Sequence, residues 1–202
     1  MQLFFTRHGE SQANVERIIS NRNLPHSLTA KGQAQTLELA ATLADQPITA
    51  IYASPILRAQ ETAQILAPKL GAPVFTRAAL REFDCGEMEG RGDNTAWMAH
   101  EAVVAAWAQG DTDQRIPGGE SFNDMRARFL PFIDQLIAEH QTTDAALLLV
   151  SHGSLLYHML PLVLPNLDHT FIRQRGMRNC LLVGATCKAG QLTCATWDGE
   201  PV

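Results

Sequence analysis

Short apolar runs alternate with helical patterns along this chain of 202 residues. The runs lie at 2–6, 49–53, 73–76 and 146–151, with a last pair at 180–187 and 191–197. Strands separated by helices are typical of a mostly parallel sheet with helices on both faces. Lys188-Ala189-Gly190-Gln191 has the composition of a hairpin turn, so one closing strand is expected to be antiparallel. The pattern predicts a three-layer α/β sandwich of about six strands, one of them antiparallel.

The helical stretches carry their own start signals. Thr29 is a capping residue for a helix ending near Leu43, whose apolar side includes Leu37. Ser54-Pro55 places a capping hydroxyl before a proline, which predicts a helix that begins at the proline. Residues 120–140 carry apolar side chains at helical spacing, and they predict a third helix.

The length of 202 residues favours one domain, 1–202, and no repeat or linker interrupts it. The stretch 91–119 departs from the strand–helix rhythm, because glycines, aspartates and a proline surround a short apolar helix containing Trp97. We expect an insertion that acts as a lid or specificity element. The alternative is a packed surface helix between glycine hinges.

Charge excludes several classes of partner. The net charge is -5, so the chain lacks the excess of basic residues that would favour binding to nucleic acid or to an anionic membrane. An anionic substrate must therefore be bound by a local cluster of cations. The chain enters its first strand at once, and the apolar stretch Leu155–Leu164 is too short to span a bilayer. We expect a cytoplasmic protein that is a monomer or a homodimer.

The four cysteines show no metal-binding spacing. No C-x-x-C pair occurs, so zinc is not expected, and the thiols are expected to be reduced and half-buried. They are Cys85, Cys180, Cys187 and Cys194.

The first apolar run is followed by polar residues that could bind a ligand or react with it. Arg7-His8-Gly9-Glu10 directly follows Leu3-Phe4-Phe5-Thr6. Open α/β sheets bind ligands at the carboxyl ends of their strands, and Gly9 would let the backbone turn and a ligand approach. An imidazole beside a guanidinium suits a phosphoryl group, because arginine binds its oxygens bidentately. The alternative is a surface turn that holds Arg7 and His8 by chance.

Two further residues are expected at the same sheet edge. His152 follows the apolar strand Leu147–Val150 and opens a helix, whose first amide groups favour anions. Arg58 lies in the first turn of the helix that Ser54-Pro55 opens. Alone, Arg58 would be interpreted as a solvated helix arginine.

These residues belong to a longer set of motifs. The segment Arg7-His8-Gly9-Glu10-Ser11-Gln12-Ala13-Asn14 resembles the signature of the histidine phosphatase (phosphoglycerate mutase-like) superfamily. Later segments resemble that family in the family's order, over roughly residues 3–180. They are Leu28-Thr29-Ala30-Lys31-Gly32, Ser54-Pro55-Ile56-Leu57-Arg58-Ala59-Gln60-Glu61-Thr62-Ala63, Leu80-Arg81-Glu82, Glu89-Gly90 and Val150-Ser151-His152-Gly153.

The resemblance implies a catalytic set of His8, Arg7, Arg58, Glu82 and His152. The residue matching His8 becomes a phosphohistidine in this family, and Glu82 stands where the family carries its general acid. Histidine can attack through one ring nitrogen while a carbonyl holds the other, and nearby arginines keep it unprotonated. His152 would donate a hydrogen bond to a phosphoryl oxygen as charge develops.

Further substrate-binding positions are expected with Arg7 and Arg58. Asn14 and Ser20 match family positions that contact phosphate or position His8. Asn21 and the accessible N–H of Gly153 join this set. No cofactor and no metal are expected, and a metallohydrolase using His8 and His152 lacks a second ligand cluster.

Other carboxylates and histidines compete for these roles. The rival acids are Glu10, Asp84, Glu87 and Glu89, of which Glu10 is expected to support the site and Glu87 and Glu89 to lie in the loop. The remaining histidines show no ligand spacing and are expected to be surface or packing residues. They are His26, His100, His140, His158 and His169.

The predicted function is hydrolysis of small phosphorylated metabolites through a phosphohistidine. A phosphoglycerate mutase is the first alternative, but mutases of this family carry a Glu-Arg-x-Tyr-Gly type motif and basic residues in the insertion. Here Glu82-Phe83-Asp84-Cys85-Gly86 stands instead, and no Lys or Arg lies between Arg91 and Arg115. A non-catalytic phospholigand-binding module is the second alternative, against which the intact catalytic set argues. The particular phosphate ester stays open.

Overall fold

The computed structural model describes residues 1–22 and 24–202. Within them one sheet has the strand order β3-β2-β4-β1-β5-β6-β7. The strands are β1 (Gln2–Arg7), β2 (Ile48–Ala53), β3 (Val74–Thr76), β4 (Ala146–Ser151), β5 (Leu182–Lys188), β6 (Gln191–Trp197) and β7 (Glu200–Pro201). β1, β2, β3 and β4 pair in parallel, whereas β5, β6 and β7 add antiparallel pairs at one edge. The predicted mostly parallel sheet is confirmed, and β7 extends it by one short strand.

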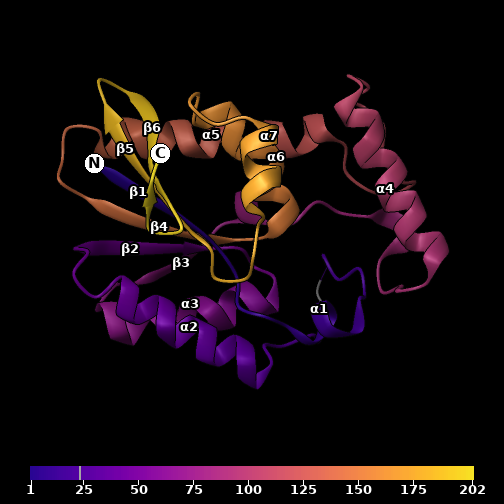
Figure 1. The fold of residues 1–202 in the computed structure, drawn as a ribbon, viewed down its shortest axis with the longest axis horizontal. Helices are drawn as coiled ribbons and strands as arrows, with labels where there is room; N and C mark the ends of the chain where they lie inside the picture. Colours follow the sequence, from indigo (N-terminus) through magenta and orange to yellow (C-terminus); the bar gives the residue numbers. More distant parts are fainter. Residues whose placement is uncertain (23) are drawn as a thin grey trace.

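Helices cover both faces of the sheet, as Figure 1 shows. α2 and α3 lie on one face, and α5, α6 and α7 lie on the other. The helices are α1 (Gln12–Glu16), α2 (Ala30–Thr42), α3 (Leu57–Leu70), α4 (Asn94–Ala108), α5 (Phe122–His140), α6 (Gly153–Val163) and α7 (His169–Arg175), with 3₁₀ turns η1 (Ala78–Leu80) and η2 (Gly86–Met88). The three-layer α/β fold class is confirmed.

The central strand β1 buries side chains on both of its faces. Leu3 and Phe5 belong to the core beneath α5 and α6, whereas Phe4 belongs to the core beneath α2 and α3. Alternate residues of a strand point to opposite faces, so a continuous apolar run is what a doubly covered strand requires. Full burial of each such side chain contributes about 1.5–3 kcal/mol, which fixes β1 firmly within the sheet.

The strand register brings the predicted site residues to one edge. Arg7 of β1 pairs with Ser151 of β4, and Ala53 of β2 pairs with Val150. Each of these parallel strands therefore ends at the same level. His8 and His152 follow directly, from chain segments far apart in the sequence.

Two local sequence predictions need correction. α3 begins at Leu57 with Ile56 as its N-cap, two residues later than Ser54-Pro55 predicts. The Ser54 N–H instead donates to the Val150 carbonyl at 3.0 Å and so extends the sheet pairing. In α2, Thr29 caps as predicted, accepting from the Gly32 N–H at 3.0 Å, but Leu37 is 49% exposed and lies outside the core.

The stretch 91–119 contains α4, which stands beyond the end of the sheet (Figure 1). Trp107 is buried in the main core, and the Trp97 indole N–H donates to the Arg17 carbonyl at 2.8 Å. The helix thus packs on one side against the core and on the other against the segment after α1. Its movement as a lid stays a prediction.

In the described part of the chain, no helix combines the length and the apolar character that crossing a membrane requires.

Candidate active site

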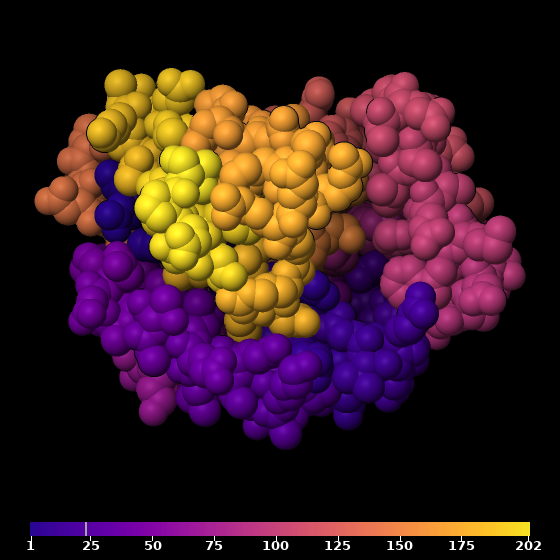
Figure 2. All heavy atoms as spheres, in the orientation of Figure 1, coloured from indigo at the N-terminus to yellow at the C-terminus, as the bar shows by residue number. Residues whose placement is uncertain are grey.

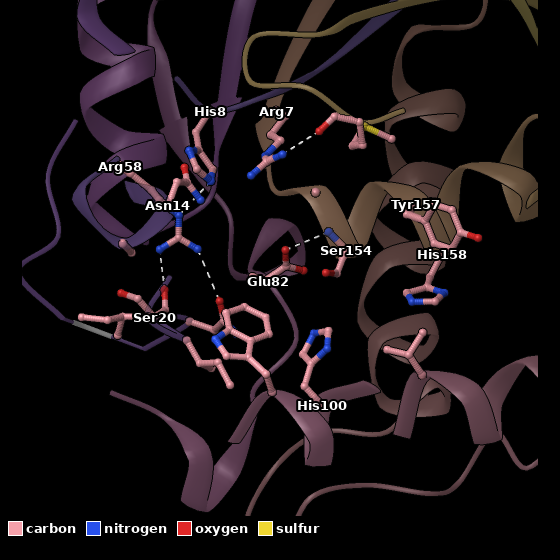
Figure 3. Close-up of a pocket in the computed structure, with 18 residues that line it drawn as sticks. Arg7, His8, Asn14, Ser20, Arg58, Glu82, His100, Ser154, Tyr157 and His158 are labelled. Carbon is pink, nitrogen blue, oxygen red and sulfur yellow. Dashed lines mark hydrogen bonds between the residues drawn. The ribbon is translucent and has the colours of Figure 1, made fainter. Parts of the chain in front are cut away.

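A pocket of about 360 Å³ lies at the carboxyl edge of the parallel strands. Figure 2 shows the surface hollowed beside the α4 segment, and Figure 3 shows the side chains inside. Most of the predicted site residues line it: Arg7, His8, Asn14, Ser20, Asn21, Arg58, Glu82 and Gly153. His152 lies behind them, fully buried. The sheet register therefore gathers the predicted set in one place.

His8 is 2% exposed and held by both ring nitrogens. Its Nδ1 lies 2.7 Å from the Gly9 carbonyl, which can only accept, so Nδ1 carries the proton. Nε2 is consequently the atom with a free lone pair, and it accepts a hydrogen bond from Arg58 Nε at 2.8 Å. This tautomer presents Nε2 as the nucleophilic atom.

Gly9 is required by the local packing. A Cβ placed there would lie 2.5 Å from the Gly32 carbonyl oxygen and 2.9 Å from Thr36 Oγ1. Only glycine lets β1 run this close to α2. Gly9 therefore fixes the carbonyl that orients His8, and the ligand approach expected from the sequence stays a prediction.

Arg58 reaches the pocket from the first turn of α3 and is 5% exposed. Besides His8, its guanidinium donates to the Ser20 carbonyl and to Asn21 Oδ1, the latter at 3.4 Å (Figure 3). Burial lowers the pKa of Arg58 to about 10, and the guanidinium stays charged at neutral pH. It is thus a fixed positive charge directly beside the predicted nucleophile.

Arg7 supplies a second buried cation. Its Nη1 donates to the Met177 carbonyl at 2.6 Å, while its Nε has no partner among the described residues. A Cβ on Gly153 would approach that Nε to 3.3 Å and Cζ to 3.4 Å. Gly153 therefore leaves room for the guanidinium to lie along the start of α6.

His152 packs against His8, with ring centroids 5.1 Å apart. It forms the N-cap of α6, and its Nε2 lies 2.7 Å from Ser54 Oγ. Its Nδ1 is buried without a partner in the described part of the chain. Because His152 does not line the pocket as it stands, its predicted contact with a phosphoryl oxygen stays a prediction. Ser54, interpreted from sequence only as a helix cap, is a further residue of the site.

Glu82 is 7% exposed and held at the N-terminus of α6. Its Oε2 accepts from Ser154 N at 2.9 Å, and its Oε1 accepts from Leu155 N at 2.7 Å and Phe83 N at 3.1 Å (Figure 3). The Ser154 and Leu155 amides are among those that a helix leaves without an internal partner. The carboxyl group is fixed within the pocket opposite Arg58.

The rival carboxylates lie elsewhere and do not line the pocket. Glu10 accepts from Thr29 and Lys31, and so anchors the start of α2. Asp84 pairs with Arg22, and Glu89 accepts from the Asn21 and Cys85 amides. Glu87 is exposed. Among the described residues, Glu82 is the carboxylate that lines the pocket.

Asn14 lines the pocket through a side chain that also closes a helix cap. Its Oδ1 accepts from the Ser11 N–H at 3.1 Å and from Asn179 Nδ2 at 3.3 Å. Asn179 Nδ2 also donates to the His8 carbonyl at 2.9 Å. Asn179 is thus a supporting residue that no sequence pattern identifies, because it lies in an irregular loop.

Ser20 and Asn21 contribute differently from expectation. The Ser20 hydroxyl lies 2.8 Å from His26 Nδ1, and it is the Ser20 backbone carbonyl that accepts from Arg58. Asn21 accepts from Arg58 through Oδ1 and donates to Cys85 Sγ at 3.4 Å. Both residues hold Arg58 in place, and direct contact with substrate stays a prediction.

Two histidines interpreted as surface or packing residues line the pocket. His100 comes from α4 and His158 from α6, and Figure 3 shows both away from His8. His158 is 6% exposed and contacts the rings of Trp107 and Tyr157 edge to face. They are packing residues as expected, but they also form the pocket wall.

The buried imidazoles are neutral at pH 7. Burial, assisted by the charges of Arg58 and Arg7, lowers the pKa of His8 well below 6.5. Burial and the same arginines lower the pKa of His152 in the same way. Desolvation and nearby positive charge both disfavour the protonated ring. His8 therefore has the lone pair that nucleophilic attack requires.

Across residues 1–22 and 24–202, no three His, Cys, Asp or Glu side chains come together in a geometry that holds a metal ion.

Comparison with known proteins identifies the family of this chain. The family model "Histidine phosphatase superfamily (branch 1)" matches residues 3–199. The chain therefore belongs to the histidine phosphatase superfamily, and the resemblance seen in the sequence motifs is confirmed. One relative, "Probable phosphoglycerate mutase GpmB" from Salmonella choleraesuis (strain SC-B67), is 30% identical over 99% of this chain and 91% of its own length.

Solved structures share the whole fold. The alpha-ribazole phosphatase from Shigella flexneri has a TM-score of 0.81 and 25% identity, covering 100% of this chain and 99% of its own. A mycobacterial glucosyl-3-phosphoglycerate phosphatase has a TM-score of 0.78 and 25% identity, covering 98% of this chain and 99% of its own. These structural neighbours are phosphatases, whereas the sequence relative is named a mutase.

Proposed function

We propose that the protein is a phosphomonoesterase that hydrolyses small phosphorylated metabolites through a phosphohistidine formed on His8. The observation that carries this proposal is the fixed tautomer of His8, with Nδ1 on the Gly9 carbonyl and Nε2 beside Arg58. Two arginines in the pocket supply positive charge for the phosphoryl oxygens. The phosphatase neighbours support the same reaction class.

In the first step, His8 Nε2 attacks phosphorus and the ester P–O bond breaks. Arg58 Nε gives up its hydrogen bond to Nε2 as phosphorus approaches, and then donates to a phosphoryl oxygen together with Arg7. The amide of Gly153, at the N-terminus of α6, faces the same anion. Glu82 delivers a proton to the departing alkoxide.

In the second step, water attacks the phosphohistidine. Glu82, now ionised, accepts a proton from this water, and the P–N bond to His8 breaks to release inorganic phosphate. His152 stabilises developing charge through its unpartnered Nδ1 once the phosphoryl group settles against it. Ser54 holds the other ring nitrogen of His152 and so orients that donor.

Hydrolysis is favoured over the mutase reaction that the name of one relative suggests. Transfer between two hydroxyl groups of phosphoglycerate requires a bisphosphate to be held, which needs cations beyond the first phosphate site. Arg7 and Arg58 are the cationic side chains among the described residues of the pocket wall, and both lie at its inner end. Water is therefore the proposed phosphoryl acceptor.

The test traps the intermediate. Wild-type protein mixed with p-nitrophenyl phosphate and quenched in alkali should carry acid-labile phosphate on His8, identified by mass spectrometry. His8→Ala should abolish turnover, and His140→Ala, at the far end of α5, should not. Folding of each variant is checked by circular dichroism. Near wild-type turnover by folded His8→Ala would overturn the proposal.

A further inference from the structure

The pocket has two chemically different ends. Charged groups cluster at the inner end, around His8, Arg7, Arg58 and Glu82 (Figure 3). Beyond the polar residues Asn14, Ser20, Asn21 and Ser154, the rest of the wall is aromatic or apolar, and this aromatic and apolar part comes from the loop after α1, from α4, from α6 and from the loop after α7. Its members are Ile18, Ile19, Trp97, His100, Val104, Tyr157, His158 and Met177.

The aromatic part of this wall is built as a continuous set of ring contacts. Trp97 and His100 of α4 meet edge to face with centroids 5.4 Å apart. Tyr157 and His158 of α6 meet edge to face at 4.9 Å. Such contacts fix the orientation of rings, so α4 and α6 present preformed π surfaces to the pocket.

The two histidines in this wall add no charge at neutral pH. Burial and the neighbouring His169 and His100 lower the pKa of His158 to about 3. Burial likewise lowers the pKa of His100. Both rings therefore act as neutral aromatic surfaces. A second anionic group on a substrate would find no cation at this end among the described residues, and desolvating it there is costly.

We propose that the substrate is a phosphate monoester whose alcohol carries an uncharged aromatic or heteroaromatic ring, seated between α4 and α6. The inference rests on the proposed phosphatase function and specifies its substrate class. The phosphate enters the inner end, and the ring of the leaving group packs against Trp97, Tyr157 and His158. A volume of about 360 Å³ is in the range that holds a small organic ligand.

The test compares esters whose leaving groups are all primary alkoxides, so that differences in rate report recognition. The probes are 2-phenylethyl phosphate, 2-cyclohexylethyl phosphate, ethyl phosphate and 3-phosphoglycerate. Burial of the phenyl ring should raise kcat/KM about tenfold to a hundredfold over ethyl phosphate. The phenyl ester should exceed the cyclohexyl ester about threefold through ring–ring contacts, and 3-phosphoglycerate should not exceed ethyl phosphate.

Two arginine substitutions on α4, one in the pocket wall and one at an exposed position, provide a matched test of the wall. Val104→Arg places a cation among the lining residues and should shift the preference toward 3-phosphoglycerate about fivefold. Met98→Arg places the same charge on α4 at a position that is 68% exposed, and it should leave the preference unchanged. Equal shifts in substrate preference in both variants would show that Val104 does not border the bound substrate, and the proposed position of the ring would be wrong.

The outcomes separate this inference from the proposed function. If none of the four esters is hydrolysed, and p-nitrophenyl phosphate is not hydrolysed either, the phosphatase proposal itself fails. If the esters are hydrolysed with 3-phosphoglycerate preferred, or with phenyl and cyclohexyl esters alike, the phosphatase stands and the aromatic substrate class is wrong.

Discussion

Lowering the pH from about 6.5 to 5.5 should destabilise the protein by about 1 kcal/mol through the buried His158, and further through His8 and His152. His8, His152 and His158 are 2%, 0% and 6% exposed. Burial lowers the pKa of each below 6.5, to about 3 for His158. Over this pH range His158 therefore stays neutral in the folded protein and takes up a proton only in the unfolded chain, and the lowered pKa values of His8 and His152 act in the same direction.

Proton linkage gives both the sign and the size of this change in folding stability. When the pKa is lower in the folded state, stability is full above the unfolded pKa and declines as the pH falls toward the folded value. With an unfolded pKa of 6.5, protonation stabilises the unfolded chain by about 1 kcal/mol more at pH 5.5 than at pH 6.5 for each histidine. His100 and His169, whose pKa values burial also lowers, act in the same direction.

Urea unfolding at the two pH values measures this effect, provided that the m-value is unchanged. His158→Leu, a replacement of similar volume, should remove about 1 kcal/mol of the pH-dependent loss whatever it does to stability at pH 6.5. Because carboxylates titrate alike in both proteins, the difference between them isolates His158. An identical pH dependence in variant and wild type, or no dependence in either, would refute the reasoning.

Three further predictions concern the site. Glu82→Gln should slow hydrolysis of an alkyl phosphate about 10²–10⁴-fold but affect p-nitrophenyl phosphate much less, because nitrophenolate leaves without a proton. Equal losses on both substrates in steady-state assays would remove Glu82 from the role of acid. Gly153→Ala should displace the Arg7 guanidinium, because the added Cβ would contact it. This variant should reduce kcat/KM about tenfold to a hundredfold, and inorganic phosphate should inhibit it more weakly as a competitor. Dialysis against EDTA should leave activity intact, and loss restored by a divalent ion would contradict the metal-independent mechanism.

The sequence predicts the position of those site residues that directly follow a regular strand. The run Leu3–Thr6 predicts a doubly buried strand, and the polar residues at its end can only emerge at the carboxyl edge of a parallel sheet. His152 follows β4 in the same way. Their meeting is thus a consequence of strand direction, which hydrophobic patterning reveals without coordinates.

Residues recruited from irregular segments could not be predicted in this way. Asn179 and the Met177 carbonyl contact His8 and Arg7 from a loop whose course is set by tertiary packing. Ser-Pro is a local signal that predicts a helix cap at Ser54, but pairing with Val150 overrides this signal. The sequence does not distinguish His158 from a packing residue, since periodicity indicates that a side chain is buried but not that it borders a pocket.

The position of β1 in the sheet has a consequence for the order of folding. β1 pairs with β4 on one side and β5 on the other, and 170 residues separate Arg7 from the Met177 carbonyl that anchors it. Contacts between distant chain segments are costly to close and form slowly. While the chain is synthesised, β1 emerges before the other strands of the sheet, yet it waits for its neighbours until β4 and β5 have been made. The catalytic edge is therefore assembled among the last parts of the molecule, and the apolar β1 is until then a segment open to wrong pairing.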